Sequence, residues 1–307
     1  MAVTVVGMFL PLLVYSSVTC IIAYVLLGVG NAILQISLNP LLNNVISSPR
    51  LLTSSLTAGQ VIKAVSSLVG PEIVLFATLH FGDDKWYYCF PILGTITLFF
   101  ALWLTFTPIW REQVEESKVS FSDSFNLLKN RTILILFWGI FFIVGVDVAT
   151  NYVSSKLMSI RYDWTAEQVK FAPQVYFFSR TVGALLGAFL LTRIAGVRYF
   201  KVNILACILM LVLLIGIHNP AVSLLCIGGV GFFASSVFSI IYSMAFQECP
   251  TKMNQISGLM LTAVAGGGVV TPVIGFAIDN AGITAGVIVI LLCVLYLTYC
   301  AFAVRER

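Results

Sequence analysis

Apolar residues occur in ten runs along the 307-residue chain, and short polar clusters separate them. A bilayer core about 30 Å thick needs about 20 apolar residues per helix, and most of the runs are about that long or longer. The pattern therefore predicts an all-α membrane protein with about ten transmembrane helices, at residues 1–15, 18–46, 53–80, 87–109, 133–158, 171–192, 200–217, 220–246, 256–278 and 284–304.

One hydrophilic stretch is much longer than the other separators. Residues 110–132 contain both acidic and basic side chains and divide the chain into two apolar blocks. We interpret this stretch as a linker between two helical bundles. Residues 1–109 then form an N-terminal bundle of about four spans, which is incomplete, and residues 133–307 form a C-terminal six-helix bundle.

Composition supports a membrane protein and excludes several other classes. Hydrophobic residues make up 59% of the chain and charged residues only 10%, against roughly 25% charged in soluble domains. No basic run suggests nucleic acid as a partner. The seven cysteines and two histidines lack metal-ligand spacing, so we expect no metal and no cofactor. No convergent His/Asp/Ser set and no nucleotide-binding glycine loop is present, which disfavours an enzyme or an ATP-driven pump.

The basic residues between the spans fall mostly on one side when alternate loops are assigned to alternate sides. Because such residues gather on the cytoplasmic side, we expect the linker and both termini in the cytoplasm and the chain in the cell membrane. The cytoplasmic set is Arg50, Arg111, Lys118, Lys129, Arg131, Arg193, Arg198, Lys201, Lys252, Arg305 and Arg307, and the opposite set is Lys85, Lys156, Arg161 and Lys170.

Two short motifs repeat with the same spacing. Gly28-Val29-Gly30 recurs 201 positions later as Gly229-Val230-Gly231, and Gly70-Pro71 falls on Thr271-Pro272. Both blocks also run in the same direction, as in transporters built from parallel repeats. With the same offset, the residues that would correspond to the start of the second block lie before Met1. We therefore expect two helices and part of a third to be missing from the start.

Several segments resemble helices of the fucose–galactose–glucose:proton symporters, a branch of the major facilitator superfamily. The glycine-rich stretch 266–276, followed by Asp279 and Gly282, is similar to the eleventh helix of that family. Other segments resemble the fourth, fifth, seventh and eighth helices, namely Gly28-Val29-Gly30 with Gln35 and Asn39-Pro40, Ser54–Gly70, Val144-Gly145-Val146-Asp147, and Ser179-Arg180-Thr181-Val182-Gly183. The resemblance implies about ten of the family's twelve helices, from part of the third to the twelfth.

Three positions depart from the family pattern. The resemblance places Gln35 where fucose permeases carry a membrane-embedded glutamate, and Lys63 where they carry a sugar-contacting asparagine. In the tenth helix, Val237-Phe238 replaces a tyrosine–proline pair. The resemblance therefore implies a sugar:proton symporter but does not point to fucose itself.

Asp147 is a charged residue inside an apolar span. Such a charge costs about 2.5–3.5 kcal/mol on insertion scales, so it usually faces a cavity or a partner. Asn151 and Ser154 follow on the same helical face, and Arg180 lies at a similar depth in the next span. We interpret Asp147 as a cavity group for substrate or proton; a structural ion pair with Arg180 is the alternative.

Amide and lysine side chains form further candidate contacts in two spans of the first block. Asn31, Gln35 and Asn39 are spaced four apart. This spacing fits either sugar contact, because amides donate and accept hydrogen bonds, or hydrogen bonds between helices. Gln60 and Lys63 share a face of the next span, and Lys63 either lines a wet cavity or extends to the interface.

The glycine-rich span offers candidates for gating or close packing rather than for binding. Without side chains, glycines permit neighbouring helices to approach closely or a helix to unwind locally. These candidates are Gly266, Gly267, Gly268 and Pro272.

Together, these observations predict a secondary transporter, not an enzyme. We expect proton-coupled symport of a neutral, fucose-, galactose- or glucose-like monosaccharide by alternating access, in a monomer embedded in the lipid bilayer. The sugar and the proton are its expected partners. The alternative is a truncated or degenerate membrane protein without transport, or a sugar sensor.

Overall fold

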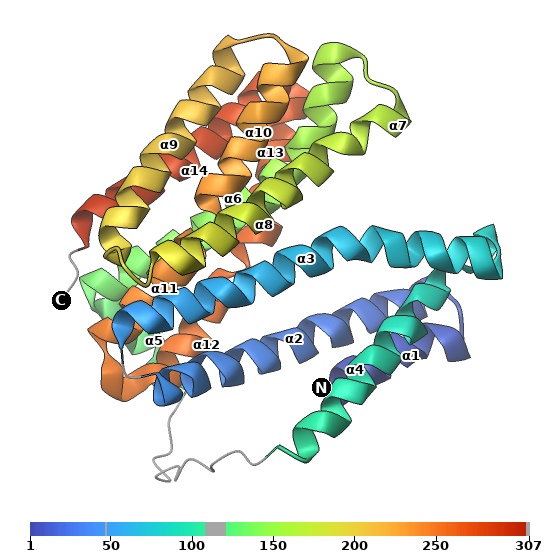
Figure 1. The fold of residues 1–307 in the computed structure, drawn as a ribbon, viewed down its shortest axis with the longest axis horizontal. Coiled ribbons are helices and arrows are strands. Elements are labelled where there is room, and N and C mark those ends of the chain that lie inside the picture. Colours follow the sequence, from blue (N-terminus) through green and yellow to red (C-terminus); the bar gives the residue numbers. More distant parts are fainter. Residues whose placement is uncertain (47, 108–120, 305–307) are drawn as a thin grey trace. The chain divides into compact units, whose positions relative to one another are not determined.

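The computed structural model describes residues 1–46, 48–107 and 121–304, and within these ranges it contains helices and no strand. The predicted all-α class is therefore confirmed. In chain order the helices are α1 (Ala2–Leu13), α2 (Ser17–Val45), α3 (Pro49–Phe81), η1 (Asp83–Tyr88), α4 (Cys89–Thr105), α5 (Phe121–Asn126), η2 (Leu127–Lys129), α6 (Arg131–Tyr162), α7 (Ala166–Val169), α8 (Phe171–Leu190), α9 (Gly196–Gly216), α10 (Pro220–Ala234), α11 (Val237–Glu248), η3 (Pro250–Lys252), α12 (Met253–Ala263), α13 (Gly266–Ala281) and α14 (Ile283–Ala303) (Figure 1).

The helices correspond to the ten predicted spans. Eight segments of the described chain are long and apolar enough to cross a membrane. The other two predicted spans are α1, a shorter apolar helix, and α8, a 20-residue helix that contains Arg180. Two of the eight segments contain a break between two α-helices. α10 is followed by α11 after a break at residues 235–236, and α12 by α13 after a break at 264–265.

The chain divides into two compact units. Unit 1 comprises Met1–Leu38 and Val69–Ser120, and unit 2 comprises Asn39–Leu68 and Phe121–Arg307. The predicted boundaries between bundles, at 1–109 and 133–307, stay a prediction. Of the predicted linker 110–132, residues 110–120 lie outside the described residues, and residues 121–129 form α5 and η2.

In unit 1, α1 packs against α4 through small residues. A Cβ atom added at Gly94 of α4 would lie 2.9 Å from the Phe9 ring, and one at Gly7 of α1 would lie 2.9 Å from Cβ of Leu26 in α2. Both distances are shorter than side chains tolerate. Glycine at these two positions therefore allows the close approach of the helices.

In unit 2, α6 is the central helix and packs against α8, α10, α11, α13 and α14. Glycines bring α8 against α10 and α13 against α6. A Cβ atom at Gly183 would overlap the carbonyl oxygen of Phe232, and one at Gly266 would overlap that of Phe141. The backbones touch at these points, so the positions of α8 and α13 relative to their neighbours are narrowly defined.

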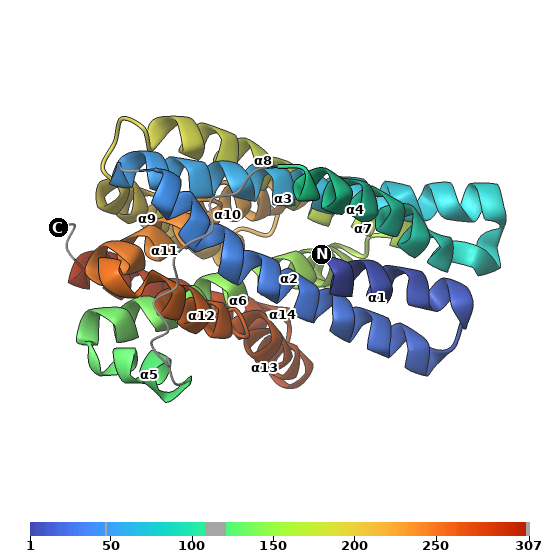
Figure 2. The ribbon, with the colours of Figure 1, turned by 90° about the horizontal axis from the view of Figure 1, so that it is seen from below.

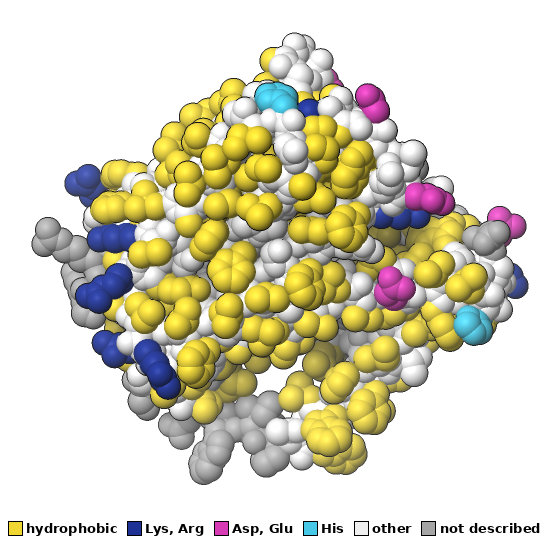
Figure 3. All heavy atoms as spheres, turned by 45° about the horizontal axis from the view of Figure 1, so that its top comes forward, with side chains coloured by type: hydrophobic (Ala, Val, Ile, Leu, Met, Phe, Trp, Pro, Cys, Tyr) yellow, Lys and Arg dark blue, Asp and Glu magenta, His cyan; other side chains and the backbone are white. Residues whose placement is uncertain are grey.

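The outer surface carries large apolar side chains. Hydrophobic side chains cover much of the face seen in Figure 3, and Phe189, Leu209 and Phe276 are each more than half exposed. A water-soluble protein would not show such a surface, whereas hydrocarbon solvates it. The structure is therefore that of a multi-pass membrane protein.

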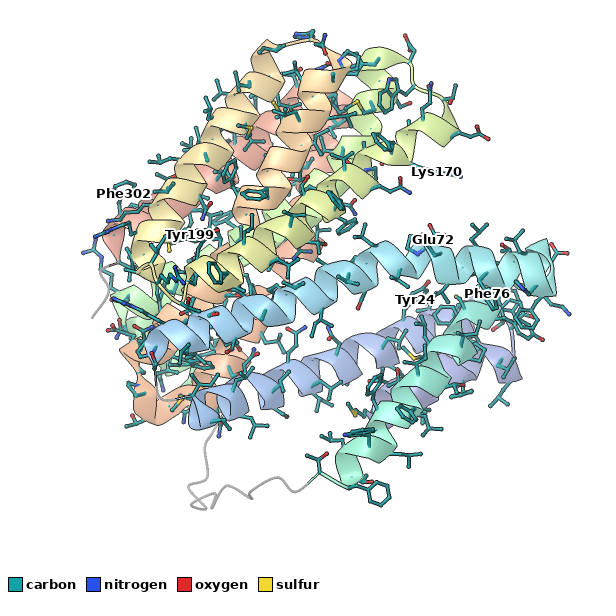
Figure 4. All side chains as sticks on the ribbon, viewed as in Figure 1. Tyr24, Glu72, Phe76, Lys170, Tyr199 and Phe302 are labelled. Carbon is teal, nitrogen blue, oxygen red and sulfur yellow. The ribbon has the colours of Figure 1, made fainter. Side chains whose placement is uncertain are left out.

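Basic residues lie at one end of unit 2. The turn between α8 and α9, the α11–α12 connection and the end of α14 gather there (Figures 1 and 2). These segments carry Arg193, Arg198 and Lys252, and nearby the Lys201 ammonium lies 4.8 Å from the centre of the Phe302 ring. Figure 4 shows Phe302 at this end and Lys170 at the opposite end.

Candidate functional site

Asp147 of α6 is held by two donors from α8. The Tyr176 hydroxyl donates a hydrogen bond to Oδ1 of Asp147 at 2.6 Å, and Nη2 of Arg180 lies 3.0 Å from Oδ2. Each carboxylate oxygen thus has its own donor. The sequence suggested the Asp147–Arg180 pair, and the structure shows it as an ion pair.

The local helix geometry explains why these side chains meet. Tyr176 and Arg180 are four residues apart, so they lie one above the other on the same face of α8. Gly231 of α10 fixes the position of that turn, because a Cβ atom there would lie only 2.7 Å from the Tyr176 carbonyl oxygen. Tyr176 is fully buried, and its hydroxyl therefore has little freedom to find another partner.

The ion pair is largely, but not completely, buried. The side chain of Arg180 is 11% exposed and that of Asp147 is 26% exposed. A buried charge is costly unless it is paired, which explains the contact with Arg180. The Asp147 carboxylate is thus more exposed than the guanidinium that pairs with it.

Lys63 brings a second positive charge close to this pair. It lies on the part of α3 that belongs to unit 2, its side chain is exposed, and it interacts electrostatically with both Arg180 and Asp147. Gln60, one turn earlier, is partly buried. Unit 2 therefore places three charged groups and one amide in one region of the membrane-spanning helices.

Asn151 lies one turn beyond Asp147 on α6. Its Oδ1 atom is buried and accepts no hydrogen bond from any described residue, and the same holds for Oγ1 of Thr150. The Ser154 hydroxyl donates to the backbone carbonyl of Asn151 at 2.6 Å. Asn151 thus retains an unused acceptor beside the ion pair.

The predicted amide stripe on α2 belongs to both units. In unit 1, Nε2 of Gln35 donates to Oδ1 of Asn31 at 3.2 Å, within the same helix. In unit 2, Asn39 forms a hydrogen bond with the Tyr242 hydroxyl, which also contacts Oγ of Ser257 at 2.8 Å. The sugar-contact role of the stripe stays a prediction.

The four gating candidates lie on α13 in different surroundings. Gly266 touches the backbone of α6, and a Cβ atom at Gly267 would come within 3.0 Å of Val148. No described atom lies within 4 Å of the Cβ position of Gly268, and Pro272 is exposed. The first two glycines permit close packing between α13 and α6, and a gating role for any of the four stays a prediction.

Three polar contacts were not predicted from the sequence. Tyr176 was missed, although its spacing from Arg180 placed it on the right face. Oγ1 of Thr53 in α3 lies 2.7 Å from Oγ of Ser243 in α11, and the Ser54 hydroxyl donates to the Ala188 carbonyl in α8 at 2.6 Å. These contacts connect the start of α3 to the rest of unit 2.

A multi-pass helical bundle with a charged cluster among its membrane-spanning helices is typical of membrane transporters. The sequence profile of the Major Facilitator Superfamily matches residues 1–272. The chain therefore belongs to the major facilitator superfamily.

Curated relatives have related names. The chain is 25% identical over 236 residues to a "Putative glucose/galactose transporter" of Helicobacter pylori (strain ATCC 700392 / 26695), a match that covers 72% of the chain and 57% of that relative. It is 24% identical over 290 residues to a "Glucose/galactose transporter" of Brucella abortus biovar 1 (strain 9-941), covering 90% of the chain and 69% of the relative. The chain thus spans little more than half the length of the Helicobacter protein.

Solved structures share the fold at low sequence identity. A variant of the E. coli fucose:proton symporter FucP matches 99% of the chain and 84% of its own length, with a TM-score of 0.84 and 18% identity. The human organic anion transporter MFSD10 matches 98% of the chain and 75% of its own length, with a TM-score of 0.73 and 15% identity. The resemblance to the fucose–galactose–glucose:proton symporters is thus confirmed at the level of fold and relatives.

Proposed function

We propose that this chain forms part of a secondary active transporter that carries a monosaccharide together with protons by alternating access. The observation that carries this proposal is the Asp147–Arg180–Tyr176 constellation, a carboxyl group held by two donors among membrane-spanning helices. Ionisable groups within membrane spans are rare, and where they occur they commonly mark substrate or proton pathways. The sugar assignment is supported by relatives named glucose/galactose transporters, so neutral hexoses are the first substrates to test.

Asp147 is the proposed site of proton uptake and release. Protonation would neutralise the carboxylate and weaken its attraction to Arg180, whose Nη2 atom lies 3.0 Å away. A state in which Arg180 stays on Asp147 disfavours the proton, and a state in which the two separate favours it. Differential proton affinity of this kind is what couples binding to a change of conformation.

The amide groups supply the neutral part of the proposed sugar site. Gln60 and Asn151 each present both a donor and an acceptor, and Oδ1 of Asn151 is buried without a partner among the described residues. A sugar hydroxyl that donates to this oxygen would satisfy it. Asn39, which also belongs to unit 2, is proposed to extend this set.

The proposed location is the cell membrane, with both termini in the cytoplasm. The end of unit 2 that carries Arg193, Arg198 and Lys252 would then face the cytoplasm, as the distribution of positive charge in membrane proteins predicts. We also propose that the protein acts as a monomer.

Counterflow of labelled galactose tests the transport proposal. The whole protein is reconstituted in liposomes loaded with unlabelled galactose, and external labelled sugar is followed against protein-free liposomes. We expect a transient accumulation of label that saturates with concentration. Binding of galactose without counterflow would instead indicate a sugar sensor, and neither binding nor counterflow with any monosaccharide would overturn the proposal.

A further inference from the structure

The positive charges beside Asp147 outnumber the negative ones. Arg180 compensates Asp147, and its Nη2 atom lies 3.0 Å from Oδ2. Lys63 adds another cation that acts on both groups, and no ion pair of Lys63 is found among the described residues. This region of unit 2 therefore carries one positive charge in excess.

The position of Lys63 follows from the packing of α3 on α8. The Ser54 hydroxyl donates to the Ala188 carbonyl at 2.6 Å, and the two helices run in opposite directions (Figure 1). At 1.5 Å per residue, Lys63 lies about 13.5 Å beyond Ser54, and Arg180 lies about 12 Å from Ala188 in the same direction. Lys63 and Arg180 therefore occupy nearly the same depth.

Lys63 also lies near the face of α3 that packs inside unit 2. The buried positions of this helix segment include Leu56 and Ala64, and Lys63 is seven residues after Leu56, which is close to two helical turns. Gln60 lies between them on the same face. The ammonium group thus extends from the margin of the packed face, at nearly the depth of Arg180.

Glu72 and Asp279 do not supply the missing negative charge. Glu72 lies nine residues further along α3, about 13.5 Å from Lys63 along the helix axis. Asp279 lies 4.0 Å from a different lysine, Lys156. An uncompensated ammonium at membrane depth is costly, and a bound anion would remove that cost.

We propose that the site takes an acidic monosaccharide, a hexuronate, whose carboxylate pairs with the Lys63 ammonium while its hydroxyl groups bond to Gln60 and Asn151. This inference rests on the proposed sugar transport and extends its substrate class beyond neutral hexoses. One carboxylate matches the excess of one positive charge. A sugar phosphate, with a charge of about −1.5 to −2 at neutral pH, would overcompensate it.

Binding and counterflow of galacturonate and galactose provide the test. Both sugars are titrated calorimetrically into the purified whole protein, and each is used as labelled substrate in proteoliposomes. Removing the charge with Lys63→Gln should lower the ratio of galacturonate to galactose affinity about tenfold, which corresponds to about 1.4 kcal/mol. Lys63→Arg keeps the charge and should retain the preference for galacturonate.

Lys170→Gln is the matched control, because it removes a lysine charge from an exposed position directly before the first residue of α8 (Figure 4). We expect it to leave the affinity ratio unchanged. The inference is overturned if galacturonate neither binds nor competes with galactose in the wild type, or if Lys63→Gln leaves the ratio as it was. Galacturonate binding that depends on Lys63 would support the inference even if counterflow failed, and that failure would count against transport alone.

Discussion

Removing one partner of the Asp147–Arg180 pair should destabilise the protein more than removing both. At the observed separation of 3.0 Å, two unit charges attract by about 5.5 kcal/mol for an effective dielectric constant near 20. Arg180→Met leaves Asp147 with the Tyr176 hydrogen bond and with Lys63, which forms no ion pair with it. Removing one partner of a buried ion pair costs about 3–5 kcal/mol. Because the Asp147 side chain is 26% exposed, we expect the lower end, about 3 kcal/mol.

The double variant Asp147→Leu/Arg180→Met removes both charges and should recover most of this loss. The measurement is the midpoint of thermal unfolding of the purified protein in detergent. A loss of about 3 kcal/mol corresponds to a fall of roughly 6–12 °C for a unit of this size. The double variant should unfold within roughly 4 °C of the wild type, a residual of about 1 kcal/mol on the same scale.

The Lys156–Asp279 pair provides the matched control. Its charged atoms are 4.0 Å apart and the Asp279 side chain is 73% exposed, so its loss should cost at most about 1 kcal/mol. The reasoning is refuted if the Asp147/Arg180 double variant loses as much stability as the two single variants added together, because additivity means that the two residues do not interact.

Three further predictions concern packing, motion and topology. Gly266→Ala should lower the free energy of unfolding by about 1–3 kcal/mol, because the added methyl group overlaps the α6 backbone. Gly268→Ala is the control: its methyl group faces open space among the described residues, so it should leave the thermal midpoint unchanged. A Thr53→Cys/Ser243→Cys pair, made in a background without the native cysteines, should cross-link across a contact now 2.7 Å long and block uptake until it is reduced. Unchanged uptake after cross-linking would show that this contact stays closed during transport. Asp163→Cys, at the end of α6, should react with an impermeant thiol reagent added from outside, and protection there would reverse the proposed orientation.

The spans were predictable because each requires a run of about 20 apolar residues, and the sequence contains such runs with polar separators. The break at 235–236 was not predictable in this way. Ser235 and Ser236 stand inside a continuous apolar run, and the Ser235 hydroxyl donates to the Phe232 carbonyl rather than to a partner on another helix. Hydropathy does not distinguish such a break from an uninterrupted helix.

Part of the site was predictable for a similar reason. The cost of intramembrane charge singled out Asp147 and Arg180, and their similar depths suggested that they meet. Tyr176 escaped notice because a tyrosine in an apolar helix is usually a packing residue, and its hydroxyl bond to Asp147 depends on the angle between α6 and α8. The sequence also showed that Lys63 lies inside a span. The excess positive charge beside Asp147 became clear only from the contact between α3 and α8, because that contact places Lys63 at nearly the depth of Arg180.

The most direct test of the account is sugar accumulation driven by a pH gradient in proteoliposomes that contain the whole protein. With the outside more acidic, the wild type should concentrate labelled sugar above its external level, and Asp147→Asn should lose this accumulation while still binding sugar and exchanging it across the membrane. Accumulation by Asp147→Asn that still follows the pH gradient would contradict the account, because Asp147 would then be a structural partner of Arg180 and the proton would be carried elsewhere.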